Sequence, residues 1–265
     1  MRISTSMIMG MFSWSAARRG QGGAARLAAR GALRVGAGLV TLGCPLRAVT
    51  ENAVQLTAIM IKGLDGTAGL AEVLEDTRIN ALCLGPGLGL GPATGELVKT
   101  ALQAQRATVL DADALSRFQR KPDSLFDMVH GAVVLTPHGG EFAKLFPDLS
   151  SQLREGRSKT DVVRQAAVRA GCTVLLKGSD TVIADSTGQC FVHNGDGHRD
   201  APWLATAGAG DVLSGIICGL LARGLPPLQA ASTAAWLHAE AALRFGPGLI
   251  AEDIPEQLPA VLATL

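Results

Sequence analysis

The eleven residues from Ala205 to Gly215, ATAGAGDVLSG, place small residues and then an acid, Asp211, at the start of an apolar, helix-compatible run. Backbone N–H groups of Gly208, Ala209 and Gly210 could approach a phosphate there, at the positive end of the helix dipole. A carboxylate beside bound negative charge suits proton abstraction from a substrate hydroxyl better than phosphate binding. The alternative is that Asp211 only caps the helix after a glycine-rich turn.

A second glycine-rich segment, GPGLGLG at residues 85–91, follows the apolar run NALCLG. Its glycines lack the two-residue gap of the dinucleotide-binding fingerprint, so a Rossmann site is disfavoured. The backbone N–H groups of this loop could still bind a ligand, and the alternative is that the glycines only form a turn.

Acidic residues and a histidine follow the next two apolar runs. In VLDADAL, Asp111 and Asp113 could orient a ribose or hold a magnesium-bound water, although capping of the next helix is the safer assignment for at least one of them. In TPHGGEF, His138 could donate a hydrogen bond to a ligand, and Glu141 could bind a metal or complete a helix cap. The pair alone does not make a zinc site.

The segment KGSDT, residues 177–181, ends a further apolar run with a cation, a glycine and two hydroxyls. Lys177 beside a Gly-Ser turn is suited to a nucleotide phosphate or ribose. An ordinary surface hairpin turn is the alternative.

Composition bounds the class of protein. The chain has 265 residues, of which 48% are hydrophobic, 18% charged and only 4% aromatic, which favours a sheet covered by helices on both faces. Five cysteines without a CxxC pair suggest a reducing cytoplasm, and with a net charge of +1 and no 18-residue apolar stretch we expect neither nucleic acid nor a membrane as a partner. Arg26, Arg30 and Arg34 form one helical stripe, either a solvated face or a contact with a phosphorylated ligand or partner.

The elements that must position these residues alternate along the chain. Helix-like GAARLAARGALR precedes the strand-like GLVTLG, and further short apolar runs end in Gly, Pro or Asp and are mostly followed by helical patterns. This rhythm predicts a single α/β domain with a mostly parallel sheet, whose ligands bind at the carboxyl ends of the strands. TVIADS and QCFVHN predict an antiparallel hairpin at the sheet edge, and residues 212–223 and 227–245 a helical pair.

The motifs together resemble one family. GAARLAARGALRVGAGLVT, LGPGLG, VLDADAL, LTPHGGEFAKL, LLKGSDTVI and PWLATAGAGDVLSG, in this order and spacing, are similar to the ADP-dependent NAD(P)H-hydrate dehydratases of the ribokinase-like superfamily. The resemblance runs from about Gly23 to near the C-terminus, which gives a ribokinase-like domain at 23–265. Relatives start it with a strand of the type VLVVGG, whereas residues 1–22 form an altered segment that is either irregular or a degraded version of that strand.

The resemblance implies a reaction. The S-form of hydrated NADH or NADPH would return to the normal coenzyme as ADP becomes AMP and phosphate. Asp211 would act as base on the C6 hydroxyl, whose oxygen attacks the β-phosphorus of ADP, with Gly208, Ala209 and Gly210 as the anion hole. The phosphorylated intermediate then expels phosphate.

The same resemblance assigns the remaining residues and partners. Lys177, Gly178, Ser179, Asp180, Thr181 and Gly210 would bind the adenine nucleotide, Ala24, Gly87, Gly89, His138 and Asp211 the hydrated coenzyme, and Glu141 would help to hold Mg²⁺. We expect a homotetramer and a separate epimerase for the other hydrate stereoisomer. The rival hypotheses are an ATP-dependent small-molecule kinase of the same superfamily and a catalytically impaired nucleotide-binding homologue.

Overall fold

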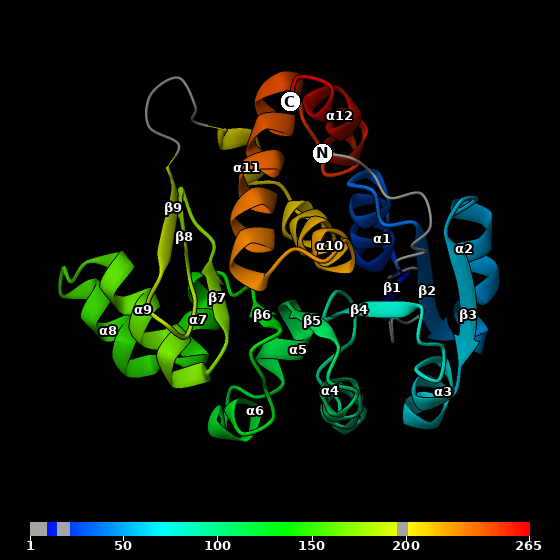
Figure 1. The fold of residues 1–265 in the computed structure, drawn as a ribbon, viewed down its shortest axis with the longest axis horizontal. Helices are drawn as coiled ribbons and strands as arrows, with labels where there is room; N and C mark the ends of the chain where they lie inside the picture. Colours follow the sequence, from blue (N-terminus) through cyan, green and yellow to red (C-terminus); the bar gives the residue numbers. More distant parts are fainter. Residues whose placement is uncertain (1–9, 15–21, 195–200) are drawn as a thin grey trace.

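One nine-stranded sheet forms the centre of the protein in the computed structural model, which describes residues 10–14, 22–194 and 201–265 (Figure 1). The strand order is β3-β2-β1-β4-β5-β6-β7-β8-β9. All pairs from β3 to β7 are parallel, whereas β7–β8 and β8–β9 are antiparallel, which confirms the predicted mostly parallel sheet. The strands are β1 (Gly10–Trp14), β2 (Leu39–Pro45), β3 (Met60–Leu64), β4 (Ile79–Leu84), β5 (Ala107–Leu110), β6 (Val133–Leu135), β7 (Thr173–Leu176), β8 (Asp180–Ala184) and β9 (Cys190–Asn194).

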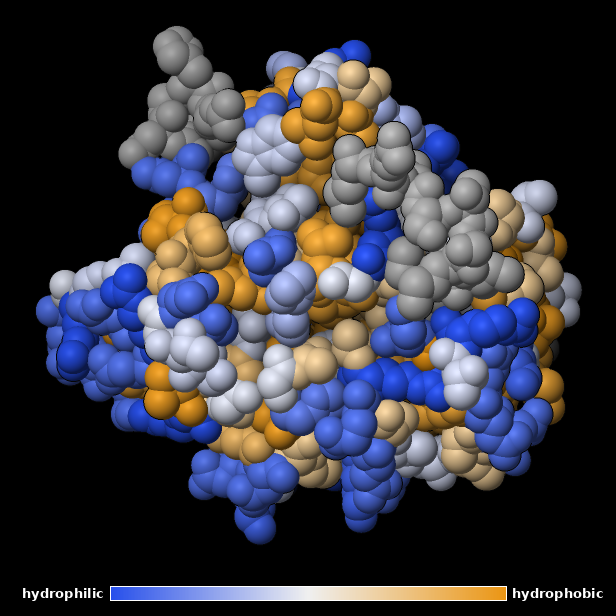
Figure 2. All heavy atoms as spheres, viewed as in Figure 1, coloured by the Kyte–Doolittle hydropathy of each residue, from blue (hydrophilic) through white to orange (hydrophobic). Residues whose placement is uncertain are grey.

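Helices cover both faces of the sheet (Figure 1). They are α1 (Gly23–Arg34), α2 (Val49–Gln55), α3 (Gly66–Val73), α4 (Pro92–Gln103), α5 (Ala112–Ser116), α6 (Asp123–Phe126), α7 (Gly139–Leu145), α8 (Pro147–Arg154), α9 (Lys159–Ala170), α10 (Ala209–Ala222), α11 (Pro227–Phe245) and α12 (Asp253–Leu262). Figure 2 shows that the outer helices α4, α6 and α8 present mainly hydrophilic side chains, while apolar atoms gather over α10. None of the described helices is long and apolar enough to cross a membrane.

Two hydrophobic cores lie on opposite faces of the sheet, because successive strand residues point in opposite directions. Cys83 and Val109 pack into the core that α1, α10, α11 and α12 share. Leu84 and Leu110, one residue further along the same two strands, pack into the core under α3, α4, α7 and α9. Since both faces are buried, the strands have continuous apolar sequences rather than an alternating pattern.

Helices α1 and α10 pack backbone against backbone. A Cβ atom on Gly215 would lie 1.9 Å from the carbonyl oxygen of Ala28, and one on Gly219 would lie 2.7 Å from that of Ala32. Only glycine allows this approach at either position. The contact fixes α1 relative to α10, whose first turn contains Asp211.

The segment at residues 1–22, expected to be irregular or degraded, contains a central strand. Residues Gly10–Trp14 pair in parallel with β2 on one side and with β4 on the other. The run GMFSW therefore forms a strand where the resemblance implies one, and its pairing with β4 is irregular between Gly10 and Met11. The rest of this segment, apart from Gly22, lies outside the described residues.

Two further predictions can be compared with the structure. The hairpin is confirmed, because β8 and β9 pair antiparallel in register. The arginines of the predicted stripe bind acidic residues of this same chain. Arg26 donates a hydrogen bond to Glu51, and both Arg30 and Arg34 form ion pairs with Glu256 of α12. These arginines thus contribute to packing between elements, with the small energies typical of exposed pairs.

Candidate functional site

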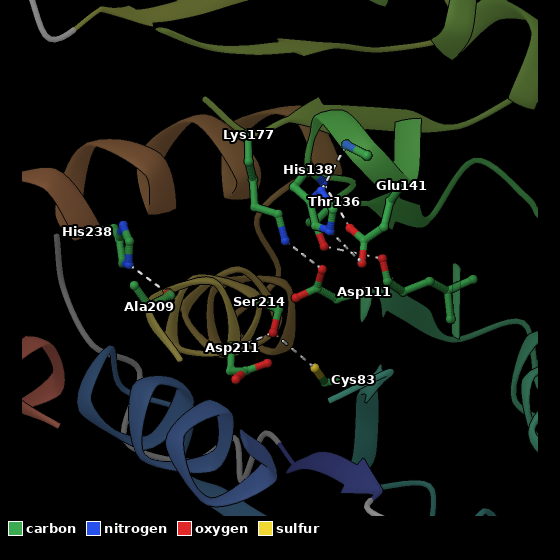
Figure 3. A network of polar contacts seen from close by, with 12 residues as sticks. Cys83, Asp111, Thr136, His138, Glu141, Lys177, Ala209, Asp211, Ser214 and His238 are labelled. Carbon is green, nitrogen blue, oxygen red and sulfur yellow. Dashed lines mark hydrogen bonds and ion pairs between the residues drawn. The ribbon is translucent and has the colours of Figure 1, made fainter. Parts of the chain in front are cut away.

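The carboxyl ends of three parallel strands meet the first turn of α10 (Figure 3). Asp111 follows β5, Thr136 follows β6 and Lys177 follows β7. Backbone hydrogen bonds join these ends, since Thr136 N–H donates to the Leu110 carbonyl (3.1 Å) and Lys177 N–H to the Pro137 carbonyl (3.0 Å). The sheet therefore brings together residues that are far apart in the sequence.

Asp111 and Lys177 form a buried ion pair. The distance from Lys177 Nζ to Asp111 Oδ1 is 2.8 Å, and the Asp111 side chain is only 2% exposed. Burial opposes the charge on Lys177, but Asp111 and the more distant acids raise the Lys177 pKa overall. The expected capping role is wrong for Asp111, whose side chain makes no capping hydrogen bond because it binds this ammonium group instead.

The first turn of α10 offers unbound amide groups. Gly208 adopts a left-handed conformation (φ 90°), and a Cβ there would lie 2.7 Å from the Leu27 side chain. Of the amides expected to form the anion hole, that of Ala209 donates to the Thr206 carbonyl (3.4 Å). Among the described residues, none accepts a hydrogen bond from the amides of Gly210 and Asp211. Lys177 Nζ lies 3.3 Å from the position of a Cβ on Gly210, so a cation stands beside these donors. Free amides, a helix dipole and a cation are the features with which proteins bind anions, so this turn is suited to a phosphate.

The Asp211 carboxyl group at this turn has a pKa close to neutrality. Its pKa is raised from 3.8 to about 7, first because it is buried and second because Asp111 repels its negative charge. Lys177 opposes this shift, and Asp113 and Glu141 add to it. Figure 3 shows that the carboxylate lies on the side of α10 that faces α1, away from Asp111 and Lys177. A carboxyl group with this pKa is suited to general base catalysis near pH 7.

A cavity of about 500 Å³ opens on the other side of this turn. Its walls come from the loop after β7, from the first turns of α10, from the 3₁₀ helix Pro202–Leu204 and from α11. Lys177 and Gly210 line one part, while Leu204, Ala235 and Ala239 make other parts apolar. Clefts of this size and mixed lining bind small molecules or cofactors.

The loop 177–181 lines this cavity, with one exception. Lys177, Gly178, Ser179 and Thr181 face it, whereas Asp180 does not belong to its lining. The Asp180 carboxylate forms an ion pair with Lys159 Nζ (3.1 Å) at the start of α9. Asp180 therefore holds the loop against α9.

His138 and Glu141 cap α7 reciprocally. Gly140 N–H donates to His138 Nδ1 (2.9 Å), and His138 N–H donates to Glu141 Oε2 (2.9 Å). The Glu141 side chain is 7% exposed and its other oxygen lies 3.5 Å from His138 Nε2. Glu141 thus completes a cap, one of its two expected roles. The described residues contain no group of three or more His, Cys, Asp or Glu side chains that could hold a metal.

The loop 85–91 is fixed largely by its own hydrogen bonds. Leu88 N–H donates to the Gly85 carbonyl (3.1 Å), and Gly89 N–H donates to Asp113 Oδ2 (2.7 Å). These two amides are therefore not offered to a ligand, and Asp113 anchors the loop rather than capping α5. Gly87 remains partly exposed in this loop, and Ala24 lies half-buried in the first turn of α1.

Two residues at or beside the cavity were not identified from the sequence. His238 of α11 is 7% exposed and lines the cavity, and Lys159 secures the loop 177–181. Ala235, His238 and Ala239 follow the three- and four-residue spacing of one helix face, which could have indicated that they face the same way. Nothing in the sequence showed that this face borders the loop after β7.

Comparisons with known proteins show the family of this chain. A family model described as NAD(P)H-hydrate dehydratase matches residues 18–257. The bifunctional NAD(P)H-hydrate repair enzyme of Moorella thermoacetica is 40% identical over 92% of this chain and 47% of its own length. The ADP-dependent (S)-NAD(P)H-hydrate dehydratase of Xanthomonas campestris is 34% identical over 92% of this chain and 84% of its own length. The chain spans about half the length of the bifunctional relatives that it matches.

Solved structures show the same fold. The ADP/ATP-dependent NAD(P)H-hydrate dehydratase of Bacillus subtilis, co-crystallised with ATP and Mg²⁺, superposes with a TM-score of 0.81 at 26% identity, covering 100% of this chain and 93% of the other. A ribokinase-like superfamily protein of Enterococcus faecalis gives a TM-score of 0.83 at 25% identity, with coverages of 100% and 91%. The ribokinase-like architecture, the family match across most of the chain and the relatives' names lead to one conclusion: this chain belongs to the NAD(P)H-hydrate dehydratase family.

Proposed function

We propose that this protein dehydrates the S-form of hydrated NADH or NADPH with ADP as the phosphoryl donor, releasing AMP and phosphate. The observation that carries the proposal is the position of Asp211. A carboxyl group with a pKa of about 7 stands at a helix N-terminus with free amides, and a nucleotide-sized cavity opens on the other side of the same turn. The names of the Xanthomonas and Bacillus relatives support the choice of substrate and nucleotide.

In this proposal the first chemical step occurs at the N-terminus of α10. Asp211 removes the proton from the C6 hydroxyl of the hydrated ring, and the oxygen attacks the β-phosphorus of ADP as the bond to the AMP oxygen breaks. The amides of Gly210 and Asp211 and the Lys177 ammonium group stabilise the charge on the transferring phosphoryl group. In this arrangement the C6 hydroxyl of the substrate lies on the side of the turn that faces α1, and the nucleotide lies on the side that faces the cavity.

Elimination then completes the reaction. The phosphate ester at C6 is a far better leaving group than hydroxide, and the ring nitrogen supplies the electron pair that expels it. Loss of the C5 proton restores the ring double bond, so that the products are NADH or NADPH, AMP and phosphate. The protein's contribution is positioning and charge stabilisation rather than covalent catalysis.

The test is product analysis with hydrated NADH and ADP. We expect AMP, phosphate and reduced coenzyme to form in equal amounts. A phosphorylated product that persists would instead identify a kinase. Stabilisation of the fold by ADP without any turnover would identify an impaired nucleotide-binding homologue.

We also propose that Mg²⁺ enters with the nucleotide. Magnesium usually keeps several waters and is bound through substrate phosphates and one or two carboxylates, so a protein cage is not required. Both oxygens of Glu141 lie next to His138 in the capping box, so this acid fits contact with the ion through water better than direct ligation. The ion would neutralise phosphate charge.

We propose that an epimerase acting on the other hydrate stereoisomer supplies the S-form. Exposed Leu46, Val54 and Met60 near the sheet edge at β3 support assembly of several copies, proposed as a homotetramer. The five cysteines are all free, which supports a cytoplasmic, reducing location.

Asp111→Asn should shift the pH profile of the reaction. Asp111 raises the pKa of Asp211 and also neutralises Lys177, so its loss leaves Asp211 with less repulsion and a freer cation nearby. Both effects lower the pKa of the base. We expect the acidic limb of kcat/KM, near pH 7 in the parent, to move about 1 unit lower.

Asp113→Asn is the matched comparison for this experiment. Asp113 contributes less to the Asp211 pKa than Asp111 does, so the limb should move in the same direction by a smaller amount. An unmoved limb in Asp111→Asn, with ADP binding retained, would show that Asp111 does not tune the base.

A further inference from the structure

His238 joins the first turn of α10 to the cavity. The distance from His238 Nε2 to the carbonyl oxygen of Ala209 is 2.8 Å (Figure 3). His238 is only 7% exposed. A carbonyl oxygen can only accept a hydrogen bond, so Nε2 must hold the proton. Burial lowers the pKa of His238 to about 4, which keeps the ring neutral under ordinary conditions.

A neutral ring with its proton on Nε2 has a lone pair on Nδ1. Among the described residues, none donates a hydrogen bond to this nitrogen. His238 lines the cavity together with Ala235 and Ala239 of the same helix. The cavity is therefore lined by a histidine that has an acceptor nitrogen without a described partner and a tautomer fixed by its contact with Ala209.

The cavity has one part suited to phosphates and another part suited to a nucleotide base. Lys177 and Gly210 mark the part of the cavity suited to phosphates, and the lining by Leu204, Ala235 and Ala239 is suited to an aromatic base. A nucleoside diphosphate whose phosphates bind at α10 must direct its base toward this apolar part. Of the polar side chains in the lining, His238 is deeply buried, whereas His193 of β9 is only partly buried. The hydroxyls of Ser179 and Thr181 can donate or accept equally.

We propose that His238 selects adenine as the base of the nucleotide, with Nδ1 accepting a hydrogen bond from the 6-amino group while Nε2–H remains bound to Ala209. The inference rests on the proposed function and specifies how its nucleotide is recognised. A 6-oxo purine would place an oxygen acceptor against the Nδ1 lone pair. If the ring carried its proton on Nδ1 instead, it could donate to that oxygen, but the Nε2 lone pair would then face the Ala209 carbonyl oxygen. Neither tautomer therefore satisfies both contacts.

The first test uses the unmodified protein and three diphosphates that differ only at position 6 of the purine. We expect calorimetric affinities in the order ADP, purine riboside diphosphate and then IDP, with ADP at least about tenfold tighter than IDP. The intermediate position of the unsubstituted purine follows because it loses a hydrogen bond without adding an opposing acceptor. Equal affinities would overturn the role of His238 while leaving the dehydratase proposal intact.

The second test replaces the residue. In His238→Leu the ratio of ADP to IDP affinity should fall to within about threefold, since a leucine side chain cannot distinguish a donor from an acceptor. Ser232→Ala, on an exposed part of the same helix, should retain the ratio of the parent. An unchanged ratio in His238→Leu would assign base selection to another group. Absence of binding by all three diphosphates would overturn both this inference and the nucleotide site of the proposed function.

Discussion

Asp211→Asn should lower turnover by about 10² to 10⁴-fold, the contribution that a positioned general base normally makes. The amide has the shape of the carboxyl group but cannot accept the hydroxyl proton. Because Asp211 lies on the α1 side of the turn and the cavity lining does not include it, we expect ADP to bind with nearly unchanged affinity. Product formation and calorimetric ADP binding, measured on the same preparation, check both halves of this expectation.

The same substitution should stabilise the fold at high pH. The Asp211 pKa is about 7 in the folded protein, whereas the ordinary value of 3.8 applies to the unfolded chain. Above pH 7 the folded protein must therefore hold the ionised carboxylate in a partly buried position, which lowers the free energy of unfolding. Below pH 4 the carboxyl group is protonated in both states and this cost disappears. At pH 8 the free energy of unfolding of Asp211→Asn should therefore exceed that of the parent by about 2 kcal/mol, a figure that allows for solvent screening. This difference should shrink toward pH 4.

Urea unfolding at several pH values measures this effect. Glu96→Gln, which removes a charge from an exposed position of α4, serves as the control and should change neither turnover nor the pH dependence of stability. Full activity in Asp211→Asn would contradict the base assignment. A stability difference that is the same at pH 8 and pH 4 would contradict the raised pKa.

Gly215→Ala should be the most destabilising single-methyl addition in the contact between α1 and α10. Its Cβ would lie 1.9 Å from the Ala28 carbonyl oxygen and 2.6 Å from the Ala28 carbonyl carbon, so backbone rather than a flexible side chain must move. Overpacking costs about 1–3 kcal/mol where side chains can adjust. Here we expect a loss above about 3 kcal/mol in the free energy of unfolding, measured by urea denaturation, and a fall in turnover because Asp211 moves relative to α1.

Gly95→Ala provides the opposite case in another helix interior. A Cβ at Gly95 of α4 would meet Arg117 at 3.5 Å, which is ordinary van der Waals contact. Alanine forms helices better than glycine, so this variant should gain up to about 1 kcal/mol. If Gly215→Ala proved as stable as the parent, the close backbone packing of α1 on α10 would be disproved.

Local sequence determined most of the elements and their order. Continuous apolar runs predicted the strands because a parallel sheet buried on both faces needs apolar residues at every position, as Cys83 and Leu84 illustrate by entering opposite cores. The glycine-rich run before Asp211 predicted the start of α10, since only residues without bulk allow the left-handed turn at Gly208. For β1 the sequence leaves two alternatives, an irregular segment or a degraded strand, because GMFSW lacks the usual pattern of a buried strand and depends on pairing with β2 and β4.

The sequence by itself also determined which residue types stand at each strand end, and the tertiary structure decided what each of them does. Asp111 and Lys177 are 66 positions apart, and the ordering of strands makes them an ion pair instead of a helix cap and a free cation. The pKa of Asp211 depends on burial and on charges from separate strands and helices, and His238 borders the cavity because α11 packs beside the loop after β7. The physical reason is that local conformation follows from neighbouring residues, whereas burial, electrostatic coupling and the tautomer of a buried ring follow from contacts between distant parts of the chain.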